Sequence, residues 1–380
     1  MFEINEGRLE KYLGDETEVV IPDSISEVDC FAFNGCTSLQ KVIIPNSVTK
    51  IAEEAFKNCS SLKEIILPDS LKIICRDVFE GCSSLQNIKI PKNVEVIRGP
   101  VFTGCDSLTS VEVDKENKYF CVENNFLIDK EFKAIVAFIG KEKTVSIPEG
   151  INAIGEWAFA YNSLLQTVKI PKSVEIITKD VFYKCDSLTS VEIAKENQYF
   201  RVEGNFLLNA KGNKIITALR METDVSFPET VTEFAEDAFR GNSTVQSMTI
   251  PNSIVEISRG AFCECSSLKE ITISDSVTKI GDYAFASCSS LESITIPDSV
   301  TEIGRGAFAD CTSLKYIKLP NSLKEIEASL FYSCSSLRTL EIPDSVQKAS
   351  LFAFKGCNLD DETRKKVEKL SIVNKILKKL

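Results

Sequence analysis

A 23-residue period constrains the fold of this chain more than any other feature. Pro22, Pro45, Pro68 and Pro91 lie 23 residues apart, and later prolines keep this spacing. Twelve phenylalanines recur at the same interval: Phe33, Phe56, Phe79, Phe102, Phe159, Phe182, Phe239, Phe262, Phe285, Phe308, Phe331 and Phe354. A repeat this short cannot bury its apolar face alone, so neighbouring repeats must stack as coils of a solenoid.

Each repeat predicts two short strands. Leu291, Ile294 and Ile296 alternate with polar residues before a proline, which is typical of a strand with one buried face. A second extended piece, 300–303, leads to the marker phenylalanine, whose ring would fill the space between two strand-bearing walls. We expect the strands of successive coils to pair in parallel, at about 4.8 Å per coil.

Cysteine recurs three residues after the marker phenylalanine. Ten of the 14 cysteines occupy this position: Cys36, Cys59, Cys82, Cys105, Cys185, Cys265, Cys288, Cys311, Cys334 and Cys357. Asn162 and Asn242 replace it in two repeats. Both residue types are small and can donate to a carbonyl of the neighbouring coil, which favours a packing role over metal or redox chemistry. We expect Cys30, Cys75 and Cys121 to fill small gaps or lie at the surface.

The full repeat is clearest from Leu268 to Leu314 and reads Leu-x-x-Ile-x-Ile-Pro-x-Ser-Val-x-x-Ile-Gly-x-x-Ala-Phe-x-x-Cys-Ser-Ser-Leu. It resembles the BspA-like, or Treponema-type, leucine-rich repeats over nearly the whole chain. The resemblance implies a curved, mostly β solenoid of about twelve 23-residue units with parallel short strands and an irregular convex side. It also implies kinship with microbial surface proteins that adhere to host or matrix proteins.

Two insertions interrupt the period, near 114–147 and 194–227, and they match each other 80 residues apart. In each, two apolar runs flank a polar turn, which predicts a β-hairpin: 125–128 with 134–136, and 205–208 with 215–216. The hairpins either enlarge a coil, which we prefer, or project the tips 130–133 and 211–214 toward a partner.

Both ends depart from the repeat, and solenoids need caps. Residues 1–21 predict an N-terminal capping hairpin, 22–359 the leucine-rich-repeat solenoid, and 360–380 a C-terminal capping helix. The helix would begin with acidic residues at 360–362. Its apolar residues keep helical spacing: Val367, Leu370, Val373, Ile376, Leu377 and Leu380. Its basic face could bind membranes or acidic partners, but capping alone explains it.

The sequence offers little for catalysis. It contains no histidine, which removes the commonest general base and the usual nucleophile pairs. The closest approach to paired metal-binding cysteines is Cys263-x-Cys265. We therefore expect no enzyme activity, no cofactor and no metal. The net charge of −11 argues against nucleic acid, and no apolar run reaches the length of a membrane span.

Binding would use residues that point outward from the strands before each proline. The candidates are Ile43, Ile66, Lys89, Lys169, Thr249, Thr272, Thr295, Tyr316 and Lys318. Tyr316 is the only aromatic residue in these stripes, which favours protein ligands over carbohydrate. Phe31, Trp157, Tyr283 and Phe352 are expected to be scattered surface aromatics.

Two functions fit these observations. The first is a monomeric, non-enzymatic protein-binding module, adhesin-like and located at the cell surface or secreted, as the resemblance implies. The alternative is an intracellular scaffold or assembly protein in the cytoplasm, because the sequence shows no signal peptide or anchor and carries many cysteines. A thiol enzyme would need a cysteine of lowered pKa in a cleft.

Overall fold

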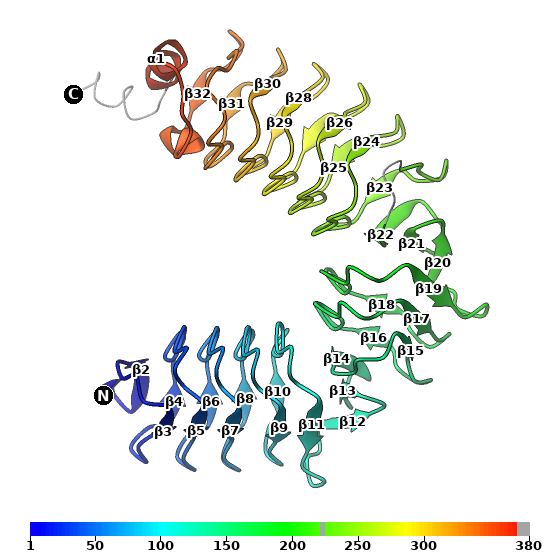
Figure 1. Ribbon diagram of the computed structural model, residues 1–380. Helices are drawn as coiled ribbons and strands as arrows, with labels where there is room; N and C mark the ends of the chain where they lie inside the picture. The colour runs from blue at the N-terminus through cyan, green and yellow to red at the C-terminus, as the bar shows by residue number, and fades with distance from the viewer. Residues whose placement is uncertain (221–224, 371–380) are drawn as a thin grey trace. The chain divides into compact units, whose positions relative to one another are not determined.

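The computed structural model describes residues 1–220 and 225–370 and divides into two compact units (Figure 1). Unit 1 comprises Met1–Cys185 and Ala194–Asn197, and unit 2 comprises Asp186–Ile193 and Gln198–Leu380. Both units consist of stacked coils.

The strand before each proline forms one side of the coils, here called the long-strand row. Its strands have three or four residues: β3 (Glu18–Val20), β5 (Lys41–Ile43), β7 (Glu64–Ile66), β9 (Asn87–Ile90), β11 (Ser110–Val113), β15 (Thr144–Ser146), β17 (Thr167–Ile170), β19 (Ser190–Ile193), β24 (Ser247–Thr249), β26 (Glu270–Thr272), β28 (Ser293–Thr295) and β30 (Tyr316–Lys318). Neighbours pair in parallel one repeat apart, as predicted; Lys41 lies opposite Glu64.

The extended piece after each proline forms the short-strand row on the other side of the coils. Its strands have two residues each: β4 (Glu27–Val28), β6 (Lys50–Ile51), β8 (Ile73–Ile74), β10 (Val96–Ile97), β16 (Ala153–Ile154), β18 (Ile176–Ile177), β23 (Glu233–Phe234), β25 (Glu256–Ile257), β27 (Lys279–Ile280), β29 (Glu302–Ile303), β31 (Glu325–Ile326) and β32 (Lys348–Ala349). In unit 2, Figure 1 shows β24, β26, β28 and β30 on one side and β25, β29 and β31 on the other. Strands therefore line both walls of each coil.

The marker phenylalanines stack between the two rows and form the centre of the core. Phe33 and Phe56 stack with ring centroids 4.8 Å apart, and Phe262 and Phe285 with centroids 5.4 Å apart. These rings are fully buried. In the enlarged coil of unit 1, Phe138 takes the place of a marker and packs 5.3 Å from Phe159.

Two left-handed backbone positions flank most markers, one two residues before it and one two residues after. Around Phe56, Glu54 and Asn58 have φ of 55° and 60°. Glycine adopts this conformation without cost, and asparagine and aspartate adopt it more readily than other residues. This explains why Gly35, Gly81 and other small polar residues recur beside the markers.

The repeated cysteine makes the predicted bond to the neighbouring coil. Nine thiols donate to the carbonyl oxygen of the marker phenylalanine 26 residues earlier, at 3.0 to 3.2 Å. Asn242 also donates backward, to Leu219 at 3.2 Å. For Asn162 the prediction is wrong, because its Nδ2 donates to Phe159 of its own coil at 3.0 Å. Each asparagine belongs to the coil directly after an enlarged coil, and the residue 26 positions before it, Val136 or Ile216, is not a phenylalanine.

Each insertion holds three antiparallel strands, one more than the predicted hairpin. They are β12 (Phe120–Glu123), β13 (Phe126–Asp129) and β14 (Ala134–Phe138) in unit 1, and β20 (Phe200–Glu203), β21 (Phe206–Asn209) and β22 (Lys214–Ala218) in unit 2. The last strand of each set pairs in parallel with the short-strand row, β14 with β16 and β22 with β23. The insertions therefore enlarge a coil of the stack.

Asn117 anchors the first insertion to the coil before it. Its Nδ2 donates to Pro91 and Val94, at 2.8 and 3.1 Å, and its Oδ1 accepts the backbone N–H groups of Tyr119 and Phe120, each at 2.8 Å. Asn197 repeats the two backward bonds in the second insertion, to Pro171 and Val174. At the hairpin tip, Lys130 folds back and donates to the carbonyl of Asn117 at 2.6 Å.

The chain begins with an antiparallel pair, β1 (Phe2–Asn5) and β2 (Arg8–Tyr12), and β2 pairs in parallel with β4. Near the other end, η1 (Leu351–Phe354) precedes α1 (Asp361–Leu370). The Asp360 carboxylate accepts the N–H of Thr363 at 2.7 Å and caps the helix, whose Val367 is buried. The predicted apolar positions Val373, Ile376, Leu377 and Leu380 lie outside the described residues. No helix in the described ranges is long and apolar enough to span a bilayer.

Candidate protein-binding surfaces

The first candidate surface is an apolar row on the long strands of unit 1. Val20, Ile43 and Ile66 occupy equivalent positions of β3, β5 and β7, and Ile43 lies opposite both of the others. They point outward because the residue before each of them is buried and strand side chains alternate. Val20 is 64% exposed and Ile66 42%. The stripe predicted from complete repeats begins at Ile43 and misses Val20, which precedes the first proline.

An ion pair borders the apolar row on its strands. Lys41 Nζ lies 2.9 Å from Glu64 Oε2, and this contact raises the pKa of Lys41 above its ordinary value. The apolar surface is therefore rimmed by charge, an arrangement that protein interfaces share.

Lys89 and Lys169 are exposed but do not extend the apolar row. The strand of Lys89, β9, pairs with β11 in a sheet separate from β3, β5 and β7, and Lys169 lies on β17 opposite Ser146. Lys89 Nζ is 3.0 Å from Asp114 Oδ2, and the hydrogen bond raises the pKa of this lysine. Ile43 and Ile66 lie opposite each other, and β9, which carries Lys89, contacts β7 in the next coil, whereas Lys169 lies on a different sheet.

The candidates in unit 2 form two small patches. Thr249 lies opposite Thr272 in the β24–β26 sheet, and Thr295 lies opposite Lys318 in the β28–β30 sheet. Tyr316, on the same strand as Lys318, is 42% exposed. The hydroxyl groups and the tyrosine can accept and donate hydrogen bonds, but neither patch is apolar.

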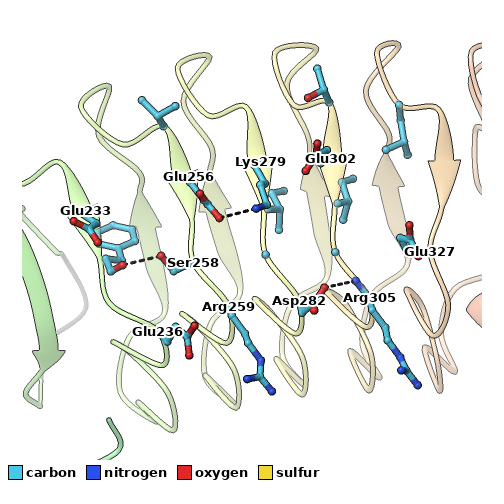
Figure 2. A pocket seen from close by; sticks show the side chains of 18 of the residues that line it. Glu233, Glu236, Glu256, Ser258, Arg259, Lys279, Asp282, Glu302, Arg305 and Glu327 are labelled. Atoms are coloured by element: carbon cyan, nitrogen blue, oxygen red, sulfur yellow. Dashed lines mark hydrogen bonds and ion pairs between the residues drawn. The ribbon is translucent and has the colours of Figure 1, made fainter. Parts of the chain in front are cut away.

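Unit 2 also carries a groove of about 1220 Å³ on its short-strand row, lined by β23, β25, β27, β29 and β31 and the turns that follow them. Figure 2 shows its charged side chains from close by. None of the predicted site residues lines it. The sequence does contain a pattern that marks this groove. Two residues after each short strand, charged residues alternate in sign over four coils: Glu236, Arg259, Asp282 and Arg305.

Some charges of the groove neutralise one another. Lys279 Nζ lies 3.1 Å from Glu256 Oε1, which raises the pKa of Lys279, and Lys214 pairs with Glu233. The Asp282 carboxylate instead accepts the backbone N–H of Arg305 at 2.8 Å (Figure 2). The guanidinium groups of Arg259 and Arg305 have no acidic partner within 4 Å among the described residues.

The expectation of scattered surface aromatics is wrong for Trp157 and Tyr283. Trp157 is half-buried and forms a cluster with Tyr161 and Tyr183, with ring centroids 6.4 and 4.6 Å away. Tyr283 is half-buried against the next coil, at Gly306. Tyr161 and Tyr183 flank the markers of successive repeats, so their rings meet that of Trp157 along the coil axis. Phe31 and Phe352 are exposed, as predicted.

Most thiols of the cysteine ladder are poor nucleophiles; the exception is the last one, Cys357, where a hydrogen bond with Cys334 lowers the pKa. Burial raises the pKa of Cys105 and Cys311 to about 12, and burial likewise raises the pKa of Cys59 and Cys82. A reactive cysteine needs a lowered pKa, because the thiolate is the nucleophile. Within residues 1–220 and 225–370, no group of three histidine, cysteine, aspartate or glutamate side chains is placed to hold a metal ion.

Three solved structures of bacterial proteins are similar to this chain. A leucine-rich cell surface protein from Faecalibacterium prausnitzii is 24% identical, with a TM-score of 0.48, over 97% of this chain and 95% of that one. The pneumococcal vaccine antigen PcpA is 20% identical, with a TM-score of 0.48, over 96% and 89%. A leucine-rich-repeat protein from Bacteroides ovatus is 27% identical, with a TM-score of 0.37, over 96% of both chains. No curated protein matches the chain.

The family model for the BspA type leucine-rich repeat region matches residues 11–127, 136–207, 221–312 and 256–371. These ranges contain the markers and the cysteine ladder, and they leave out residues 128–135 and 208–220 of the two enlarged coils. The chain therefore belongs to the BspA-type leucine-rich-repeat family.

Proposed function

We propose that this chain is a non-enzymatic protein-binding module that acts as a monomer and contacts a host or matrix protein at the cell surface. The observation that carries the proposal is the apolar row Val20–Ile43–Ile66 on the long strands, in which Val20 and Ile66 are exposed and Ile43 is half-buried, flanked by the Lys41–Glu64 pair. Adjacent exposed aliphatic side chains on a rigid sheet favour contact with a protein. The description of one similar structure as a cell surface protein agrees with this location.

Substitution of the row tests the proposal. A V20S/I43S/I66S variant should lose binding to immobilised host extracellular-matrix proteins by about 10-fold or more, because burying three aliphatic side chains contributes several kcal/mol. A matched control replaces two exposed aliphatic residues elsewhere in unit 1, V122S/I176S, and should bind like the unaltered chain. Equal binding by the triple variant and the control would contradict the proposal.

The second candidate is an intracellular scaffold or assembly protein. It is favoured by the 14 cysteines, all free in the structure, including the exposed Cys30. Free thiols persist most readily in reducing compartments. Protease added to intact cells separates the two candidates: the surface module is cleaved, whereas the scaffold is cleaved only after lysis.

A further inference from the structure

The groove of unit 2 presents two arginines in the same orientation. Arg259 and Arg305 follow β25 and β29, both are exposed, and Figure 2 shows both side chains extending in the same direction at the edge of the groove. Neither has an acidic partner within 4 Å in the ranges that the structure describes. Guanidinium groups bind carboxylates in a bidentate geometry, so two free guanidiniums form a recognition element for carboxylates.

The fold keeps these arginines apart from the acidic residue between them. Asp282 occupies the equivalent position of the intervening coil, one coil from each arginine, and Glu236 occupies it one coil before Arg259; neither forms an ion pair with these arginines within the described ranges. The Asp282 carboxylate instead accepts the backbone N–H of Arg305 at 2.8 Å. Residue 304 must be glycine for this bond to form, because a Cβ at Gly304 would lie 2.5 Å from Asp282 Oδ1. Asp282 is thus held by the backbone, and both guanidiniums remain available.

The spacing selects the conformation of a ligand. The arginines are two coils apart, which is about 10 Å along the stack. A polyproline II helix rises about 3.1 Å per residue with three residues per turn, so its side chains recur on one side about every 9 Å. In a β-strand they recur about every 7 Å. Carboxylates at positions i and i+3 of a polyproline II peptide match both arginines, and those of a strand do not.

Glu302 adds a requirement for a cation. It lies on β29, lines the groove in the same coil as Arg305, and stands opposite Lys279, whose ammonium group is instead paired with Glu256. The neighbouring glutamates of the row, Glu256 and Glu325, are paired with Lys279 and Lys348. A ligand that carries only negative charge would face this carboxylate at close range, so the groove favours a ligand with a basic group between its acidic ones.

We propose that this groove binds a proline-rich, extended protein segment with acidic residues at i and i+3 and a lysine or arginine between them. The lining residues come from five successive coils, about 20 Å in length, which accommodates about six residues of a polyproline II helix. The groove is separate from the apolar row of the proposed function, so it provides the chain with a second surface of different chemistry.

A synthetic peptide tests the proposal on the full chain. The probe is the acetylated and amidated peptide Pro-Glu-Pro-Lys-Glu-Pro-Pro, and the spacing control is Pro-Glu-Lys-Glu-Pro-Pro-Pro, which has the same composition with the glutamates at i and i+2. Calorimetric titration should show saturable binding of the probe below about 1 mM, weakened by salt, and at least about 10-fold weaker binding of the control. No binding of the probe, or equal binding of the two peptides, would overturn the proposal.

Variants locate the site. R259Q and R305Q should each weaken probe binding about 10-fold or more, while R338Q, at an exposed arginine outside the groove, should leave it unchanged. The charge-reversed R305E should recover affinity for a probe whose second glutamate is lysine. Full affinity in R259Q and R305Q would refute the site. The V20S/I43S/I66S variant should bind the probe normally, which separates failure of this inference from failure of the proposed function.

Discussion

The Sγ atom of Cys311 donates a hydrogen bond to the carbonyl oxygen of Phe285, in the preceding coil, at 3.1 Å. Both side chains are fully buried, so the bond joins two coils in the interior. The same bond recurs along both units. The Phe285 carbonyl also accepts the backbone N–H of Cys288, at 3.3 Å, so the thiol is the second donor to a carbonyl that lies in an apolar core.

Replacing Cys311 with alanine should therefore destabilise unit 2 by about 1 to 3 kcal/mol, through a lost hydrogen bond and a small cavity. Urea unfolding measures the change. Replacing the exposed Cys30 with alanine serves as the control and should change stability by less than about 0.5 kcal/mol. Equal effects of the two substitutions would show that the ladder bond does not stabilise the fold.

The cysteine ladder should also make stability fall at alkaline pH. An unfolded thiol has a pKa of about 8.5, whereas burial raises the pKa of Cys311 to about 12. Between these values the unfolded chain binds fewer protons than the folded chain, so the free energy of unfolding decreases as pH rises, by up to about 1.4 kcal/mol per pH unit for each such thiol. Below pH 8 this contribution is fully present.

Unfolding measured from pH 9 to 10.5 in the unaltered chain and in C311A tests that slope. The variant should lose stability less steeply, by about 1.4 kcal/mol per pH unit. Identical slopes would mean that the thiol titrates alike in both states.

Gly306 should tolerate no side chain, for two separate reasons. Its φ is 62°, and an added Cβ would lie 2.5 Å from the ring of Tyr283. G306A should lose about 2 to 4 kcal/mol in thermal or urea unfolding, of which about 1 to 2 kcal/mol is backbone strain. Gly204 separates backbone strain from steric overlap, because its φ is 56° and nothing lies within 4 Å of an added Cβ. G204A should therefore lose less stability than G306A. Adding Y283A to G306A should not remove the backbone strain at residue 306.

Asn117 should be essential to the first enlarged coil. It is 3% exposed and makes four hydrogen bonds that join the insertion to the preceding coil. N117A would remove all four bonds, although the Pro91 carbonyl would still accept the N–H of Val94, and should lose about 3 kcal/mol. Hydrogen exchange should show the loss concentrated in β12 and β13. Asn87, exposed on β9, is the matched control, and a comparable loss in N87A would contradict the role of Asn117.

The period of the sequence was sufficient to predict the coils, because nearly every marker and ladder cysteine occupies a buried position whatever its surface neighbours are. The enlarged coils were predicted in part: polar turns revealed the pair β13–β14, whereas β12 begins at Phe120 with only one buried residue and shows no alternation. The apolar row was found at Ile43 and Ile66. The groove was not predicted, because its charge depends on which side chains form ion pairs across coils. The Asp282 carboxylate, for example, accepts a backbone N–H, and no sequence pattern reveals this bond.

The cysteine bond has a consequence for how a gene for such a protein can grow. An ordinary coil offers its phenylalanine carbonyl to the thiol of the following coil and its own thiol to the carbonyl of the preceding coil. Duplication or deletion of 23 residues therefore leaves a thiol and a carbonyl facing each other at the new junction. An enlarged coil breaks this rule, because the coil after it carries Asn162 or Asn242 in place of cysteine. Copying such a coil must include its successor, and the 80-residue interval between the two copies does. Lineages of this architecture should thus differ in length by whole coils, with each enlarged coil inherited together with its asparagine.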